Sequence, residues 1–110
     1  MDSKLLTGTL EMLVLEVISQ NPSYGYEIAQ TVAQQTGGLF EMKEGSLYPA
    51  LHRLEQQKHV SSFWKEFEGR RRKYYRISAA GQAALEAKKE EWRQFAQAIH
   101  GVIGVNALGS

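Results

Sequence analysis

The spacing of apolar residues predicts a first helix over residues 5–20. Six apolar side chains recur at the three- and four-residue intervals of a helix and form one face: Leu6, Leu10, Leu13, Val14, Val17 and Ile18. A second apolar row, Leu5, Met12 and Leu15 with Gly8 between them, lies on another side of this helix. A helix that is apolar on two sides needs two packing partners. We therefore expect one row to face the core of this chain and the other to face a second subunit.

Breaker residues predict a short second helix. Residues 21–23 (NPS) end the first helix and offer Ser23 as the cap of the next one, which reaches Thr36 before two glycines follow. A brief extended segment is then expected over residues 39–44.

A third helix is predicted after Gly45 and Ser46, which offer a cap and place Pro49 in the first turn, where its missing N–H costs least. Its buried face is formed by Leu47, Ala50, Leu51 and Leu54. The opposite face is polar and carries Tyr48, His52, Arg53 and Gln56.

From Val60 the pattern changes to the alternation of β-strands. Two runs, residues 60–65 and 73–77, are joined by residues 68–71 (EGRR) and predict a hairpin with a basic tip. Ser78 then offers a cap for a long last helix, from residue 79 to about residue 100. Its apolar positions keep helical spacing: Leu85, Trp92, Phe95, Ala96, Ile99 and Ile103.

This order of elements is that of a winged helix-turn-helix, a mostly α fold with a small β-hairpin (α+β). We expect the winged helix-turn-helix over residues 1–78, the long helix over 79–104 and a flexible tail over 105–110. The length of 110 residues suits one small domain, and at this size a partner chain is an early expectation.

The composition and the motifs of the chain argue against several classes of function. The absence of cysteine excludes disulfides and thiolate metal sites. No apolar run approaches the roughly 20 residues needed to span a bilayer, and the N-terminus lacks the plan of a signal peptide, so we expect a cytoplasmic protein with no membrane partner. The histidines His52, His59 and His100 are scattered without metal-ligand spacing, and no P-loop or nucleophile motif occurs. We expect neither an enzyme nor a bound metal or cofactor.

Charge is concentrated in one place. The net charge of +1 conceals residues 65–76, which carry six basic and two acidic side chains. Such a local field attracts polyanions, because arginine and lysine neutralise phosphates and release counterions. A helix N-terminus with a hydroxyl beside it adds hydrogen bonds to a phosphate. We expect base discrimination from Tyr48, His52 and Arg53.

Three blocks carry a family resemblance: residues 24–28 (YGYEI), 44–55 (EGSLYPALHRLE) and 69–78 (GRRRKYYRIS), followed by Gly81. They resemble the signature blocks of the PadR family of bacterial transcriptional regulators, and the single long helix after the wing resembles its short subfamily. The resemblance implies a homodimeric repressor that binds an inverted-repeat, double-stranded DNA operator, with the third helix in the major groove and the wing on the neighbouring backbone.

Together, the residues and the resemblance give a set of candidate DNA contacts: Tyr24, Lys43, Ser46, Tyr48, Pro49, His52, Arg53, Gly69, Arg70, Arg71, Arg72 and Lys73. For Tyr24 and Tyr26, packing at the start of the second helix is an equal alternative, and Tyr74 and Tyr75 are read as strand packing residues. The rival function is that of a winged-helix module that binds another protein and no specific DNA.

The resemblance also implies that the first and last helices build the dimer, through Leu5, Met12, Leu15, Trp92, Phe95, Ile99 and Ile103. Trp92 resembles the last-helix tryptophan of multidrug-responsive members, in which two indoles flank planar aromatic ligands between the subunits. The implied effector pocket is formed by Leu5, Gly8, Met12, Leu15, Trp92, Ala96 and Ile99. The alternative role of Trp92 is that of an interface aromatic without a ligand. Lys88 and Lys89 on the preceding turn make such a pocket narrower or more polar.

Overall fold

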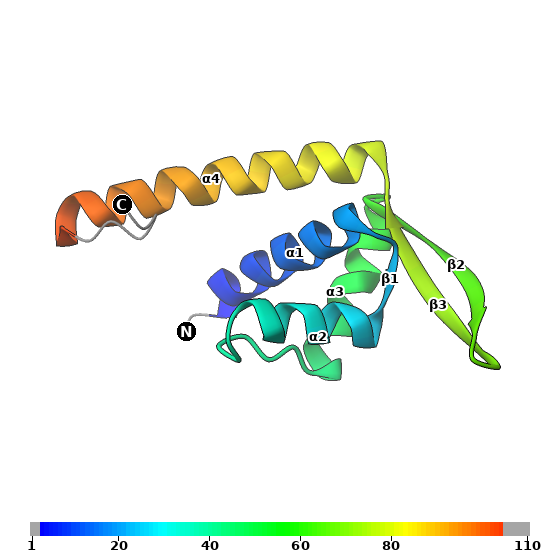
Figure 1. Ribbon diagram of the computed structural model, residues 1–110. Coiled ribbons are helices and arrows are strands. Elements are labelled where there is room, and N and C mark those ends of the chain that lie inside the picture. Colours follow the sequence, from blue (N-terminus) through cyan, green and yellow to red (C-terminus); the bar gives the residue numbers. More distant parts are fainter. Residues whose placement is uncertain (1–2, 105–110) are drawn as a thin grey trace.

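The computed structural model describes residues 3–104, with side chains from residue 8 onward. Its elements are α1 (Ser3–Gln20), β1 (Ser23–Tyr24), α2 (Gly25–Gln35), α3 (Glu44–Gln56), β2 (Val60–Phe67), β3 (Arg70–Ile77) and α4 (Ala79–Ile103) (Figure 1). The strands form one antiparallel sheet in the order β1-β3-β2. The predicted α+β winged helix-turn-helix with a long last helix is confirmed. The predicted tail over residues 105–110 lies outside the described residues.

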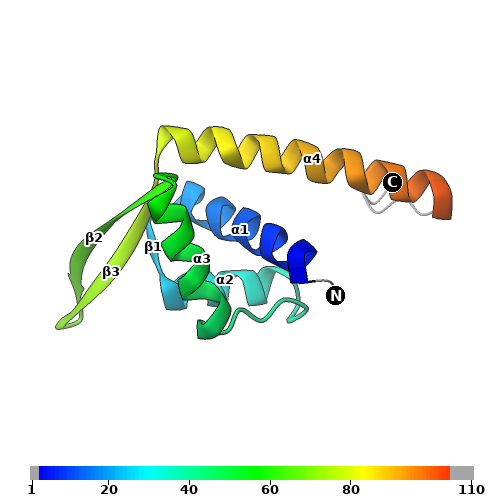
Figure 2. The same cartoon turned by 180° about the vertical axis from the view of Figure 1, so that it is seen from behind.

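The molecule is elongated, with extents of 52 × 28 × 26 Å. Helices α1, α2 and α3 pack into a body, and the hairpin of β2 and β3 projects from one side of it (Figures 1 and 2). Helix α4 crosses above α1, and its C-terminal part continues past the body on the side opposite the hairpin. One helix therefore has a half that is packed and a half that overhangs.

The core gathers side chains from all four helices and from the base of the sheet. Its buried members include Val14, Leu15, Ile18, Ile28, Leu47, Leu51, Leu54, Val60, Tyr75 and Leu85. The expectation that Leu15 faces a second subunit or an effector is wrong, because its side chain is fully buried here. At 100° per residue, Leu15 lies only 60° from Ile18 around α1, within the breadth of the core-facing stripe.

The start of α2 differs from the prediction. Ser23 does not cap this helix; it belongs to β1 and pairs with Tyr75 of β3. The carboxylate of Glu27 instead accepts a hydrogen bond from the backbone N–H of Tyr24, at 3.3 Å. The extended segment expected over residues 39–44 forms no strand, and the two-residue β1 completes the sheet. So short a strand leaves no alternation to recognise.

The buried face of α3 is confirmed, but the helix begins earlier than predicted, at Glu44 with Lys43 as the preceding cap residue. Pro49 therefore lies in the second turn. There it cannot donate the hydrogen bond that the carbonyl of Gly45 would accept in a regular helix.

The hairpin turn is tighter than the sequence suggested. Glu68 and Gly69 alone form it, both with positive φ, while Arg70 and Arg71 already belong to β3. The predicted cap of α4 is confirmed, because the Ser78 hydroxyl accepts a hydrogen bond from the N–H of Gly81 at 3.0 Å. Gly81 also lets α4 approach the chain before β2, since a Cβ there would lie 2.0 Å from the carbonyl oxygen of His59.

Candidate nucleic-acid interface and effector groove

The outer face of α3 is exposed, as the sequence predicted. Lys43, Ser46, Pro49 and His52 are all exposed, and Tyr48 keeps 47% of its surface open. The helix thus buries its leucines and presents Ser46, Tyr48 and His52 on one accessible side, with Lys43 just before its start.

Tyr48 does not project freely from this face. A Cβ at Gly25 would lie 2.6 Å from the Tyr48 hydroxyl oxygen, so the phenol rests directly against the start of α2. Its ring lines a hollow of about 380 Å³ between α3 and β3, together with Tyr24, Gly25, Arg72, Lys73 and Tyr75. This position suits a backbone contact beside the wing better than a base contact deep in a groove.

Arg53 is engaged inside the chain. Its Nε donates to Glu11 Oε1 of α1 at 2.9 Å, and Lys88 Nζ of α4 lies 3.9 Å from the other oxygen of the same carboxylate. Glu11 is largely buried, with 11% of its side chain exposed, whereas Arg53 remains 41% exposed. One carboxylate thus joins α1, α3 and α4, a role that sequence reasoning missed. The signal was an acidic residue within an apolar helix.

The basic residues of the wing divide between the two faces of the hairpin. In the register of β2 and β3, Arg70 and Arg72 lie on one face and Arg71 and Lys73 on the other, and Gly69 belongs to the turn. Lys73 Nζ lies 3.7 Å from Glu55 Oε1 of α3. The face that carries Lys73 is therefore the one turned toward α3. The sequence grouped these four cations in one basic tip, but alternation separates them.

Tyr24 lies in an aromatic cluster at the base of the wing. Its ring centroid is 5.3 Å from that of Tyr74 and 6.4 Å from that of Tyr26. The guanidinium of Arg72 stands 4.5 Å from the ring of Tyr24 and donates a hydrogen bond to its hydroxyl. The packing role predicted for Tyr74 and Tyr75 is confirmed, since both are buried, and burial raises the pKa of the Tyr75 phenol.

A groove between α1 and α4 brings together part of the predicted effector pocket. Two cavities flank Trp92 and Met12, one of about 260 Å³ and one of about 340 Å³. Ala96 lines the first and Gly8 lines the second. The first cavity is also lined by Leu13, Glu16, Lys89 and Arg93. The second is also lined by Thr9, Lys88, Glu91 and Phe95.

Three residues of the predicted pocket stand apart from these cavities. Leu15 is in the core, Ile99 lies further along α4 and lines neither cavity, and the side chain of Leu5 lies outside those the structure describes. Leu13, which the periodicity placed on the core-facing side, lines the groove instead.

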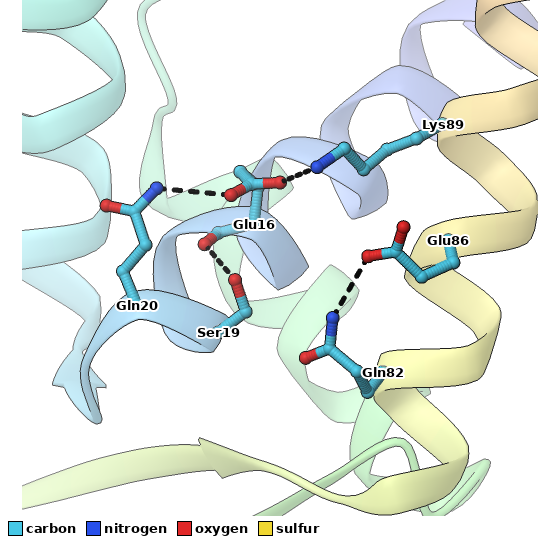
Figure 3. A network of polar contacts seen from close by, with 6 residues as sticks. All are labelled: Glu16, Ser19, Gln20, Gln82, Glu86 and Lys89. Atoms are coloured by element: carbon cyan, nitrogen blue, oxygen red, sulfur yellow. Dashed lines mark hydrogen bonds and ion pairs between the residues drawn. The ribbon is translucent and has the colours of Figure 1, made fainter.

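An ion pair between α1 and α4, drawn in Figure 3, joins two residues that line the first of these cavities. Lys89 Nζ donates to Glu16 Oε1 at 2.7 Å, and Gln20 Nε2 donates to the other oxygen at 3.1 Å. These two donors, Lys89 first, hold the pKa of Glu16 below its usual range, and the same contact raises the pKa of Lys89. The groove is therefore apolar along Trp92 and Met12 and charged at its edge.

Beyond the groove, α4 exposes an apolar row. Trp92, Phe95, Ile99, Val102 and Ile103 keep between 42% and 86% of their surfaces open. The rings of Trp92 and Phe95 have centroids 5.9 Å apart. Residues 8–104 leave this row largely open, although its spacing is that of a helix face built to be buried.

Two other kinds of site are absent from the part of the chain that the structure describes. No three histidine, aspartate or glutamate side chains gather there as metal ligands. No helix there is both long and apolar enough to cross a membrane.

Known proteins resemble this chain over nearly its whole length. Residues 14–87 match the transcriptional regulator PadR-like family. Transcriptional regulator Rv3488 of Mycobacterium tuberculosis is 30% identical over 86% of this chain and 85% of its own length. A transcriptional regulator of Clostridium thermocellum superposes with a TM-score of 0.83 and 34% identity, over 90% of this chain and 97% of its own. A PadR family transcription regulator of Clostridium difficile superposes with a TM-score of 0.77 and 33% identity, over 86% of this chain and 97% of its own.

Proposed function

Because this chain belongs to the PadR-like family of transcriptional regulators, which bind DNA and are not enzymes, we propose that it is a homodimeric repressor acting on an inverted-repeat operator. The observation that carries the proposal is the pairing of an exposed polar face on α3 with an uncovered apolar row on α4. In this assignment residues 1–78 bind DNA and residues 79–104 form the dimer.

The apolar row supports the dimer. Phe95, Ile99 and Ile103 occupy one stripe of the overhanging half of α4, where a second copy of the same helix supplies matching apolar surface. A two-fold axis brings the same patch of both chains together, so each favourable contact occurs twice. The Trp92 edge of this row continues into the groove against Met12 of α1.

The DNA role rests on α3 and the wing. Ser46, Tyr48 and His52 are presented on the open side of α3, and the cations of β3 stand beside them. In a two-fold dimer, two such helices read half-sites about one helical turn apart, roughly 10 base pairs. The likeness of α3 and the wing to those of PadR regulators implies that this chain represses transcription.

The two cavities beside Trp92 support release by a ligand. Together they have the several hundred Å³ of a small-molecule site, and Trp92, which lines both, keeps 46% of its surface open. A planar aromatic compound lying between the two Trp92 rings of a dimer would favour one spacing of the recognition helices over another. Only a ligand with different affinities for the two spacings can shift DNA binding.

The test is a titration of the full chain with the DNA upstream of its own gene, followed by transcription from that promoter in vitro. The proposal expects a complex of two chains per site, competition only by the same sequence, and transcription that falls as the site fills. Size-exclusion chromatography with and without this DNA separates the rival function. A module that binds only protein would stay free of DNA at every salt concentration.

A further inference from the structure

The alternation of side chains gives the wing two faces of different composition. The outer face carries Ser61, Phe63, Lys65, Phe67, Arg70, Arg72, Tyr74 and Arg76, and the inner face carries Val60, Ser62, Trp64, Glu66, Arg71, Lys73, Tyr75 and Ile77. Ser62 Oγ donates to Glu55 Oε2 of α3 at 2.6 Å, which fixes the inner face as the one turned toward α3.

Charge is distributed unequally between these faces. The outer face holds four cations and no carboxylate, and among the described residues none of the four forms an ion pair. The inner face holds two cations, each near an acid. Lys73 pairs with Glu55, and Arg71 stands directly opposite Glu66 in the register. The local positive field of the hairpin therefore comes from its outer face.

Aromatic rings hold Lys65, Arg72 and Arg76 of the outer face in place. The guanidinium of Arg72 lies 4.5 Å from the ring centroid of Tyr24 and 5.4 Å from that of Phe67, and Lys65 Nζ lies 5.5 Å from that of Tyr74. Stacking on a ring leaves the N–H edge of a guanidinium free to donate to phosphate oxygens. Arg71 and Lys73 also lie over rings, so the carboxylates, and not the rings, distinguish the two faces.

Two neighbouring cations of β3, one from each face, lie near Tyr48 of the recognition helix. Arg72 of the outer face and Lys73 of the inner face both line the hollow that contains the exposed ring of Tyr48 from α3. Lys73 already pairs with Glu55, whereas Arg72 forms no ion pair among the described residues, so Arg72 is the cation of this hollow that a phosphate can pair with.

We propose that Lys65, Arg70 and Arg72 on the outer face of the wing bind the DNA phosphate backbone, and that Arg71 and Lys73 on the inner face do not. The proposal rests on DNA binding by this chain. It divides residues 70–73, which were predicted together as DNA contacts from the sequence, and it adds Lys65 to the contacting residues.

The experiment compares two double variants that remove the same charge. R70Q/R72Q acts on the outer face and R71Q/K73Q on the inner face, so the long-range field changes equally in both. Binding of the full chain to a mixed-sequence duplex is measured by fluorescence anisotropy between about 50 and 200 mM salt, because phosphate contacts are independent of sequence. We expect R70Q/R72Q to raise the Kd about 100-fold at 0.1 M salt, since each lost contact costs about tenfold there. R71Q/K73Q should stay within about threefold of the parent chain.

The salt dependence is the second readout. Two lost phosphate contacts should lower the slope of log Kd against log salt by about 1.8 for R70Q/R72Q and leave it unchanged for R71Q/K73Q. Because Arg72 also bonds Tyr24, K65Q/R70Q serves as an outer-face pair without that bond, and it should show the same loss. Circular dichroism checks that each variant is folded.

Equal losses in the inner and outer variants, or a larger loss in the inner one, would overturn the proposal while DNA binding by the parent chain still stands. If the parent chain binds no duplex at low salt, the proposed function itself has failed.

Discussion

The two halves of α4 carry apolar residues at the same helical spacing, but only the first half is covered. Within residues 79–89, Leu85 is buried in the core, Gly81 contacts the chain before β2, and Lys89 pairs with Glu16. Within residues 92–103, Phe95, Ile99 and Ile103 lie open. The pattern of a helix shows which side must be buried and does not show what buries it. The difference between the halves is the reason to look for a second chain.

The largest effect is expected in the uncovered half. Ile99→Asp places two carboxylates in the proposed dimer interface, one from each chain, where both lose water without gaining a partner. We expect the dimer to dissociate at least about 100-fold more readily, because each buried, unpaired charge costs several kcal/mol. Light scattering coupled to size-exclusion chromatography measures the mass.

Gln97→Asp is the matched control, because it adds the same charge to an exposed position on another side of α4. If both variants stay dimeric, or both become monomeric, the exposed apolar row is not the dimer interface.

In the covered half, Leu85→Ala should lower the free energy of unfolding by about 2–5 kcal/mol, the usual cost of emptying a fully buried leucine site. Urea denaturation followed by circular dichroism, at fixed protein concentration, gives this number. A loss below about 1 kcal/mol would show that the first half of α4 is not packed as described here.

Gly81→Ala tests the closest approach of α4 to the body. At an ordinary exposed helix position this change stabilises by up to about 1 kcal/mol. Here the new Cβ meets the His59 carbonyl, so we expect a loss of about 1–3 kcal/mol. Gly101→Ala, in the overhanging half where a Cβ meets nothing within 4 Å, should stabilise or be neutral. Thermal unfolding of the two variants should thus shift in opposite directions.

The smallest effect concerns the Glu16 and Lys89 pair, whose side chains are 35% and 39% exposed. Because folding lowers the pKa of Glu16, its contribution to stability is complete above the unfolded pKa and is lost as the pH falls through the lower, folded pKa. Folding raises the pKa of Lys89, so its share is lost only in strongly alkaline solution. Glu16→Gln should cost less than about 1 kcal/mol near neutral pH.

The measurement is the difference in unfolding free energy between the parent chain and Glu16→Gln from pH 7 to pH 3. The difference should shrink as the pH falls. A difference that stays constant would mean that the carboxylate adds nothing through its charge.

Periodicity was sufficient for the helices and the hairpin because each buries a regular stripe. Leu47 and Leu51 were recognised as core residues in this way. Features with no period were missed, including the two-residue strand at Ser23 and the start of α3 one turn ahead of its expected place. Leu15 was misassigned because a helix position between two faces is resolved only by what packs on it.

The sequence predicted which residues form the candidate site better than it predicted what those residues contact. The exposed side of α3 and the basic wing follow from polarity and charge. That Arg53 is held by Glu11, that Tyr48 rests on Gly25, and that the wing cations split between two faces depend on tertiary packing. One-dimensional spacing carries no information about such long-range partners.

The most direct test of a two-fold DNA-binding dimer is a hydroxyl-radical footprint of the full chain on the DNA upstream of its own gene, with the stoichiometry read by analytical ultracentrifugation. The account predicts two chains per site and two protected blocks, related by symmetry and about one helical turn, roughly 10 base pairs, apart. A single protected block with one bound chain, or protection spread evenly along the duplex, would contradict it.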